Sequence, residues 1–288
     1  MQISSLFKEK KTVLSFEVFP PKKTSPIETI YSTLDNLKDL KPDFISVTYG
    51  AGGNAGDTST CDIAAYIKQK YQIEPLAHLT CVNYTKAEIL QILNRLEQSG
   101  IENILALRGD LNPDVEPKKE FRYASDLVAF IRDRGGFHVS GACYPEGHIA
   151  SESLIEDTLN LKKKVEGGAE HLISQLFFDN SYFYSFLERA RIAGIQVPIE
   201  AGIMPVVNKA QIERMVTLCG ASLPSKFTKM LQRFEHSPEA LRDAGIAYAI
   251  NQIVDLIAQG VDGIHLYTMN NSYLAKKISD SIKGLIEA

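Results

Sequence analysis

The sequence predicts a single domain over residues 1–288 with the α/β architecture of a (β/α)8 barrel, the TIM barrel. Eight short β-rich runs recur along the 288 residues. Most are almost continuously apolar, as in parallel strands that are buried on both faces. Helical patterns alternate with these runs, and no linker or change of composition divides the chain. An open, doubly wound sheet is the main alternative architecture.

The eight expected strands are spread evenly over the chain. In order, they read TVLSFEVF from Thr12, DFISVTY from Asp43, PLAHLTC from Pro75, NILALRG from Asn103, FHVSGACY from Phe137, HLISQLFF from His171, VPIEAGIM from Val197 and DGIHLYTM from Asp262.

Helices are expected between the strands, and two of them have clear start signals. The segment SPIE (Ser25 to Glu28) offers an N-cap serine, a proline and a glutamate three residues after the cap, and TKAE at Thr85 opens a helix in the same way. Further helices are expected near residues 58–70, 123–134, 153–166, 181–193, 208–218 and 273–286. Between the seventh and eighth strands we expect an extra helix at 224–234 and then a long one at 238–259.

Charge and composition exclude several classes of function. A net charge of −4 and a pI near 5.9 provide no basic surface for nucleic acid. No apolar run approaches the length of a membrane helix, and the first residues lack the apolar region of a signal peptide, so we expect a cytoplasmic protein. The four cysteines form no CxxC pair, which predicts neither a metal site nor a disulfide framework.

Chemistry in a barrel of this class belongs at the carboxyl ends of the strands. Glu17 stands at the end of the first strand among Phe16, Val18 and Phe19, just before two prolines, which predicts a functional carboxyl on that rim. Polar groups also end the other strands: Thr48, Tyr49, His78, Thr80, Arg108, Asp110, Tyr144, Glu146, His148, Gln175, Tyr267, Thr268 and Asn270. No lysine stands at a strand end, which argues against a Schiff-base aldolase. No G-x-G-x-x-G motif follows a strand. The residues therefore indicate a barrel enzyme with one or two working carboxylates.

Eight motifs occur in the order typical of one family. SFEVFPPK, VTYGAGG, HLTC, LALRGD, YPEGH, ISQLFFD, GIMPV and GVDGIHLYTMN resemble the methylenetetrahydrofolate reductase family, in its bacterial form without a regulatory domain. The resemblance implies an FAD-containing barrel that reduces 5,10-methylenetetrahydrofolate to 5-methyltetrahydrofolate with NADH or NADPH. In that family the nicotinamide and the folate take turns at the flavin, and the product supplies methyl groups for methionine synthesis. We expect a homo-oligomer; the preferred nicotinamide and the need for an accessory electron-transfer subunit are left open.

The resemblance also implies catalytic and substrate-binding roles. Glu17 matches the general acid that protonates the departing nitrogen of the folate ring, and burial beside Phe16 and Phe19 would favour its neutral form. Asp110 matches the aspartate near the flavin and the pterin, where a carboxylate would stabilise a cationic iminium. Gln175 and Gln211 match folate-binding glutamines.

Fifteen positions match FAD-binding residues of the family. They are Thr48, Tyr49, Ala51, His78, Arg108, Gly109, Asp110, Tyr123, Ala124, Tyr144, His148, Asp157, Asn160, Lys163 and Lys164.

Two residues depart from the pattern of better-known bacterial members. Asn271 stands where an arginine contacts the folate, and Lys163 stands where others carry arginine, which keeps the charge but loses the bidentate fork.

Two other functions compete with the reductase. One is another FAD barrel, similar to proline dehydrogenase, and the other is a barrel without catalysis that binds folate or a protein partner. Glu17 and Gln175 argue against the first, and the presence of Glu17, Asp110 and Gln175 together argues against the second.

Overall fold

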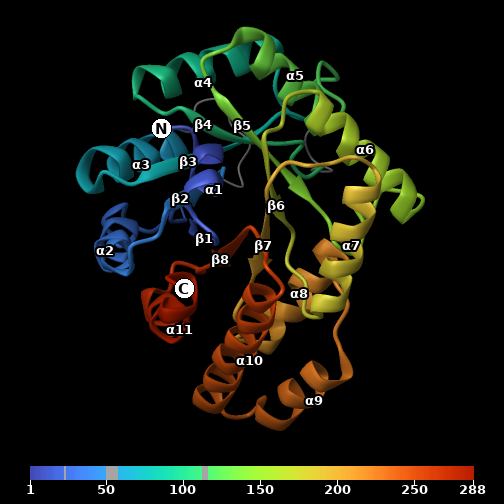
Figure 1. Ribbon diagram of the computed structural model, residues 1–288. Coiled ribbons are helices and arrows are strands. Elements are labelled where there is room, and N and C mark those ends of the chain that lie inside the picture. Colours follow the sequence, from blue (N-terminus) through green and yellow to red (C-terminus); the bar gives the residue numbers. More distant parts are fainter. Residues whose placement is uncertain (23, 50–57, 112–115) are drawn as a thin grey trace.

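Eight parallel strands close into a barrel in the computed structural model, which describes residues 1–22, 24–49, 58–111 and 116–288, without the side chains of residues 211, 214 and 218 (Figure 1). The strands are paired in chain order, and β1 pairs with β8 to close the ring. The predicted (β/α)8 barrel is confirmed, and the open-sheet alternative is excluded.

Each strand lies inside one of the predicted runs. The strands are β1 (Val13–Val18), β2 (Phe44–Val47), β3 (Glu74–Thr80), β4 (Asn103–Leu107), β5 (His138–Cys143), β6 (His171–Ser174), β7 (Ile199–Ile203) and β8 (Gly263–Tyr267). Only β3 begins one residue earlier than expected.

The helices lie outside the ring of strands (Figure 1). They are α2 (Glu28–Leu37), α3 (Ser59–Tyr66), α4 (Lys86–Gln98), α5 (Ala124–Arg134), α6 (Leu154–Glu166), α7 (Asn180–Ile192), α8 (Lys209–Cys219), α9 (Ser225–Phe234), α10 (Pro238–Ala258) and α11 (Ser272–Ile286). The extra helix predicted between the seventh and eighth strands is α9. None of the helices in the described ranges is long and apolar enough to cross a membrane.

The two predicted capping boxes have different outcomes. Thr85 caps α4 as expected, since Glu88 N donates to Thr85 Oγ1 at 3.2 Å and Thr85 N donates to Glu88 Oε2 at 2.7 Å. The prediction of a capping box at Ser25 is wrong, because α2 begins at Glu28 and its N-cap is Ile27. Ser25 belongs to a preceding turn, in which its N–H donates to Lys22 O at 2.7 Å.

An N-terminal segment that the sequence pattern did not predict closes the lower end of the barrel, the end at which the strands begin. It consists of η1 (Ile3–Ser5) and α1 (Leu6–Glu9). Ile3 is fully buried, and its N–H donates to Asn103 Oδ1 at 2.9 Å, at the start of β4. The Phe7 ring lies 4.8 Å from the ring of His171 at the start of β6. These contacts seal the end opposite the carboxyl rim.

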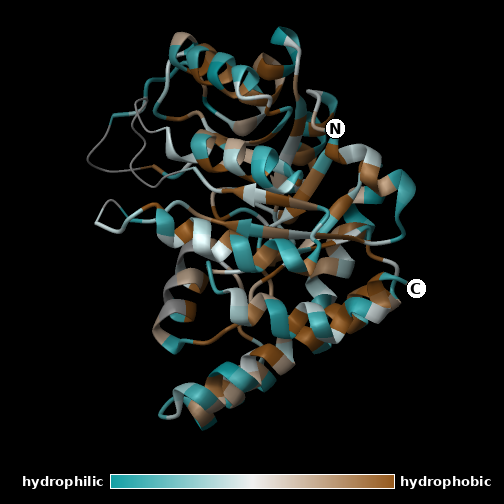
Figure 2. Ribbon diagram, turned by 90° about the vertical axis from the view of Figure 1, so that its left-hand side faces the viewer, coloured by the Kyte–Doolittle hydropathy of each residue, from teal (hydrophilic) through white to brown (hydrophobic). Residues whose placement is uncertain are grey.

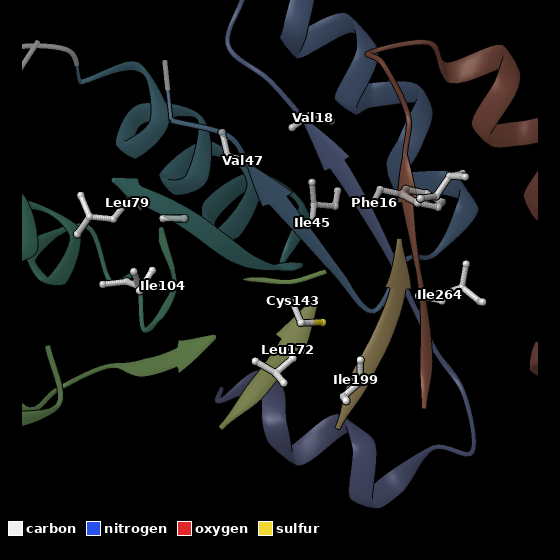
Figure 3. Close-up of a cluster of buried hydrophobic side chains, with 14 of the residues drawn as sticks. Phe16, Val18, Ile45, Val47, Leu79, Ile104, Cys143, Leu172, Ile199 and Ile264 are labelled. Carbon is white, nitrogen blue, oxygen red and sulfur yellow. The ribbon is translucent and has the colours of Figure 1, made fainter. Parts of the chain in front are cut away.

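The largest apolar core lies between the strands and the helices. Figure 3 shows side chains of this cluster, with at least one labelled residue from every strand. Phe16 and Val18 of β1 belong to it, together with Ile30 and Leu34 of α2. Hydrophobic and hydrophilic residues alternate along most of the outer helices, shown brown and teal in Figure 2, as in helices that pack one side on a core.

Two helical glycines provide a matched test of packing. A Cβ at Gly245 in α10 would lie 1.7 Å from the carbonyl oxygen of Val206, whereas a Cβ at Gly284 in α11 would meet nothing within 4 Å. We expect Gly245→Ala to destabilise the protein by about 3 kcal/mol or more, because the backbone at Val206, in the loop after β7, has to move. Gly284→Ala should stabilise it by about 0.5–1 kcal/mol through helix propensity. Urea unfolding of both variants checks this pair, and a Gly245→Ala protein as stable as the parent would contradict the packing.

Candidate active site

The carboxyl of Glu17 projects into the barrel at the rim. Successive side chains of a strand point to opposite faces, so Ser15 and Glu17 point inward while Phe16 and Val18 point to the helices. The side chain of Glu17 is 19% exposed, and its Oε2 lies 3.6 Å from His78 Nε2 and 3.5 Å from His265 Nε2. Thr268 Oγ1 donates to the Glu17 carbonyl oxygen at 2.6 Å. The strand end that carries the carboxyl is therefore fixed.

The expected apolar setting of Glu17 is wrong in its details. Phe16 lies in the core on the other face of β1, and Phe19 is 36% exposed. Asn270 holds the Phe19 backbone, donating to its carbonyl oxygen at 2.8 Å and accepting from its N–H at 3.0 Å. Two imidazoles face the carboxyl instead. Burial lowers the pKa of His78 to about 4 although Glu17 opposes this shift, so this imidazole is neutral near pH 7.

Below Glu17 the barrel interior is polar, which sequence reasoning missed. Ser15 Oγ lies 2.8 Å from Glu200 Oε1 and 2.6 Å from His265 Nδ1. Glu200 Oε2 lies 3.0 Å from His171 Nε2, and His171 Nδ1 lies 3.0 Å from Ser140 Oγ. The signal in the sequence was a period of two: polar residues two apart in otherwise apolar strands, as in Ser15 and Glu17, or His265 and Tyr267.

Burial sets the protonation of this interior. It raises the pKa of Glu200 to about 8, against the opposing effect of His265 and the hydrogen bond from Ser15. It lowers the pKa of His171 and of His138 to about 3 each. At neutral pH the Glu200–His171 pair is therefore uncharged, which avoids the cost of a buried ion pair.

A second cluster gathers residues that were expected to bind the cofactor. The rings of Tyr144 and His148 lie edge to face, 4.7 Å apart. Burial raises the pKa of Tyr144 to about 12, with contributions from Asp157 and Asp110 and an opposing one from Arg108. Burial also lowers the pKa of His148, and Arg108 adds to this effect. These mutual effects show that residues from the ends of β4 and β5 and from α6 share one electrostatic environment.

A glycine turn holds Arg108 and Asp110 at the end of β4. Gly109 has a φ of +86°, and a Cβ there would lie 3.0 Å from Thr80 Cβ. The Arg108 carbonyl oxygen accepts from Cys81 N at 3.2 Å and Val82 N at 2.9 Å. The turn therefore packs against the end of β3, and the exposed Asp110 stands on the rim.

Helix α6 carries four expected cofactor residues, of which one reaches the sheet. Lys164 Nζ donates to the Ala142 carbonyl oxygen at 2.6 Å, and burial lowers the pKa of Lys164. It passes over Gly141, where a Cβ would lie 2.7 Å from Lys164 Cδ. Asp157 Oδ1 accepts from Ser151 Oγ at 3.1 Å, whereas the exposed Lys163 reaches only Asn160 Oδ1, at 3.3 Å.

The other expected site residues lie at strand or helix ends. Gln175 follows β6, and its Oε1 accepts from Leu176 N at 2.9 Å. Thr48 and Tyr49 follow β2, and Tyr123 and Ala124 stand at the start of α5. Asn271 is the N-cap of α11, because its Oδ1 accepts from Tyr273 N at 3.1 Å and Leu274 N at 3.2 Å. Ala51 and the side chain of Gln211 lie outside the described residues.

The model of one protein family, "Methylenetetrahydrofolate reductase", matches residues 2–283. The chain belongs to this family. The resemblance inferred from the eight motifs is thereby confirmed, and with it an oxidoreductase of one-carbon metabolism.

Curated relatives agree over most of the chain. The 5,10-methylenetetrahydrofolate reductase of Pectobacterium carotovorum is 37% identical over 93% of this chain and 89% of its own length. That of Escherichia coli is 36% identical over 93% of this chain and 90% of its own. The Arabidopsis thaliana methylenetetrahydrofolate reductase (NADH) 1 is 35% identical, but only 48% of its length is matched.

Solved structures share the fold at low sequence identity. A Clostridium thermocellum protein described as binding two copies of 5-methyl-5,6,7,8-tetrahydrofolic acid has a TM-score of 0.70 at 14% identity, with 100% of both chains covered. A tryptophan synthase chain of M. tuberculosis has a TM-score of 0.54 at 11% identity. Among the described residues, no group of three His, Cys, Asp or Glu side chains is placed to hold a metal ion.

The raised pKa of Glu200 predicts a particular dependence of stability on pH. Its folded-state pKa of about 8 lies above the ordinary value of 4.5, so the folded protein keeps a proton that the unfolded chain releases between these values. Raising the pH through this window therefore lowers stability, by at most about 1.4 kcal/mol per pH unit for one proton. We expect the melting temperature of Glu200→Gln, relative to the parent, to rise from pH 5 to about pH 8 and to level off above it. A difference that does not change with pH would contradict the buried, protonated carboxyl.

Proposed function

We propose that residues 1–288 form one catalytic, FAD-binding domain that reduces 5,10-methylenetetrahydrofolate to 5-methyltetrahydrofolate with NADH or NADPH. The observation that carries the proposal is the Glu17 carboxyl on the rim of a barrel of this family, opposite the charged cluster at the ends of β4 and β5. The folate bound to the Clostridium thermocellum barrel is compatible with such a substrate.

The donors near the rim support FAD as the cofactor. Arg108 and Lys164 supply positive charge beside the ends of β4 and β5, and His148 adds a ring nitrogen, all suited to a pyrophosphate or the polar edge of a flavin. Tyr144 offers a half-buried ring and hydroxyl in the same cluster. When bound there, FAD would supply the hydride chemistry, accepting from the nicotinamide and donating to the folate in separate half-reactions.

Glu17 acts as the general acid toward the folate. Opening the five-membered ring of methylenetetrahydrofolate to an iminium requires a proton on the departing nitrogen, and a carboxyl on the rim can deliver it. The neighbouring His78 is neutral near pH 7, because burial lowers its pKa to about 4.

The remaining rim residues orient the substrate and stabilise its charge. Asp110 is an exposed carboxylate that would stabilise the cationic iminium. Gln175 would bind the pterin through its amide, and Gln211 remains a proposed folate ligand. Asn271 uses its oxygen to cap α11, so it would bind the folate tail only through its amide nitrogen.

Glu17→Gln separates the two half-reactions. We expect flavin reduction by NADH or NADPH to change less than about twofold, whereas flavin reoxidation by methylenetetrahydrofolate should fall by about 10²–10⁴, because only that half needs the acid. Rapid mixing under argon with absorbance of the flavin measures both rates.

The matched control is Glu170→Gln, an exposed carboxyl before β6 at the opposite end of the barrel. It should leave both half-reactions unchanged. Equal loss of both half-reactions in Glu17→Gln would assign Glu17 a structural role and reject it as the acid.

Two neighbouring lysines test the cofactor site. Lys164→Met should lower the ratio of bound flavin to protein, because it removes a cation that reaches the end of β5. Lys162→Met is the control, since Lys162 pairs with Glu166 on the surface of α6 at 3.9 Å. Absorbance after gel filtration gives the ratio. Full flavin content in Lys164→Met would remove this residue from the proposed site.

A further inference from the structure

A continuous polar path joins two carboxyls inside the barrel. It runs from Glu200 Oε1 to Ser15 Oγ over 2.8 Å, from Ser15 Oγ to His265 Nδ1 over 2.6 Å, and from His265 Nε2 to Glu17 Oε2 over 3.5 Å. Glu200, Ser15 and His265 are each fully buried, and Glu17 alone reaches the rim. His265 Nε2 makes its hydrogen bond with Ser46 Oγ, at 3.5 Å, so the step to Glu17 is a contact that has to tighten when the substrate binds, as bonds to catalytic groups often do.

The path has two arrangements that differ by the position of one proton. In the first, Glu200 is protonated and donates to Ser15 Oγ, the Ser15 hydroxyl donates to His265 Nδ1, and His265 Nε2–H faces an ionised Glu17. In the second, Glu17 is protonated and donates to His265 Nε2, His265 Nδ1–H donates to Ser15 Oγ, and the Ser15 hydroxyl donates to an ionised Glu200. A serine hydroxyl and an imidazole each donate at one point and accept at another, so in both arrangements every step of the path has one donor and one acceptor.

We propose that Ser15 and His265 relay a proton from Glu200 to Glu17, so that Glu200 is the proton reserve of the rim acid. The proposal rests on the proposed role of Glu17 as the proton donor to folate. Three O–H or N–H bonds break and three form: Glu200 Oε1–H passes its proton to Ser15 Oγ, Ser15 to His265 Nδ1, and His265 Nε2 to Glu17 Oε2. Glu17 then passes one proton to the departing nitrogen, and the cycle closes when water reprotonates Glu17 at the rim and the relay runs backward.

The surroundings of both ends favour this role. The pKa of Glu200, raised to about 8 by burial, keeps the reserve protonated at neutral pH. The titratable or charged groups around Glu200 are His171, His265, Asp43 and Asp262, with His138 beyond His171; those around Glu17 are His78, His265 and Tyr267. The pKa values of His78, His171 and His138 are all lowered, so these three imidazoles do not donate protons to the path near pH 7.

A second series of contacts, the lower branch, runs from Glu200 through His171 to Ser140 and fixes the end at which protons enter the path. Glu200 Oε2 meets His171, which continues to Ser140 and ends below β5 and β6, where η1 and α1 cover the barrel. Protons from solvent therefore enter at the Glu17 end, and Glu200 stores rather than conducts them.

The decisive experiment is the pH profile of flavin reoxidation by methylenetetrahydrofolate in the purified flavoprotein. In the parent protein we expect the rate to hold up to about pH 8 and to fall above it, as the reserve ionises. In Glu200→Gln the fall should begin at least about one pH unit lower, with a loss of about tenfold at pH 7.5. At pH 5.5, where protons from solvent are about a hundred times more abundant than at pH 7.5, the variant should match the parent within about twofold.

A second variant breaks the path without removing the reserve. Ser15→Ala should reproduce the shifted profile of Glu200→Gln, whereas Ser140→Ala, a buried serine on the lower branch, should retain the parental profile. An infrared titration provides a readout apart from turnover: a protonated carboxyl band that disappears near pH 8 should be present in the parent and in Ser15→Ala and absent in Glu200→Gln.

The outcomes separate the relay from the proposed function. If methylenetetrahydrofolate does not reoxidise the parental flavin, or if Glu17→Gln reoxidises at the parental rate, the proposed function fails. If reoxidation depends on Glu17 but Glu200→Gln and Ser15→Ala keep the parental pH profile, the relay alone is wrong. A shift in Ser140→Ala equal to that in Ser15→Ala would also overturn it, because any change in the buried network would then have the same effect.

Discussion

The alternation of side chains along parallel strands is the constraint on which the rest of this structure depends. In a closed barrel, one side of each strand packs on helices and the other faces seven other strands across a narrow space. In β1 this constraint separates Phe16 and Val18, which fill the outer core, from Ser15 and Glu17, which meet polar partners from β3, β7 and β8. Because most of the hydrophobic burial is supplied outside the ring, the interior above the apolar cluster of Val13, Phe44 and Leu76 can hold serines, imidazoles and carboxyls.

The predictions from sequence succeeded where a local pattern determines the structure. The apolar runs located all eight strands, and the composition of the segments between them located the helices, including α9. The predicted start of α2 was wrong because Ser25 forms a turn with Lys22 and does not cap the helix. Local patterns also missed η1 and α1, whose formation depends on contacts with Asn103 and His171 far along the chain.

In the candidate site too, local patterns identified single residues but not the residues around them. A carboxyl at a strand end was enough to single out Glu17, but its environment was inferred from Phe16 and Phe19, which are neighbours in sequence and not in space. The true neighbours of this region come from β3, β7 and β8: the Ser15 hydroxyl meets residues 185 and 250 positions away. Similarly, the run of three lysines gives no sign that Lys164 is the one that reaches the sheet; the missing Cβ of Gly141 on another element makes room for it. The cofactor positions could therefore come only from the family resemblance.

The segment that closes the lower end of the barrel has a consequence for how the chain acquires its structure. Residues 3–9 precede every strand in the chain, yet the surfaces that pack on Ile3, Leu6 and Phe7 include residues of β2, β3, β4 and β6, and β1 completes its pairing only with β8. These are contacts of long sequence separation, which form slowly. During synthesis the apolar side chains of residues 3–9 therefore stay exposed until β6 has been made, which leaves them open to non-native contacts.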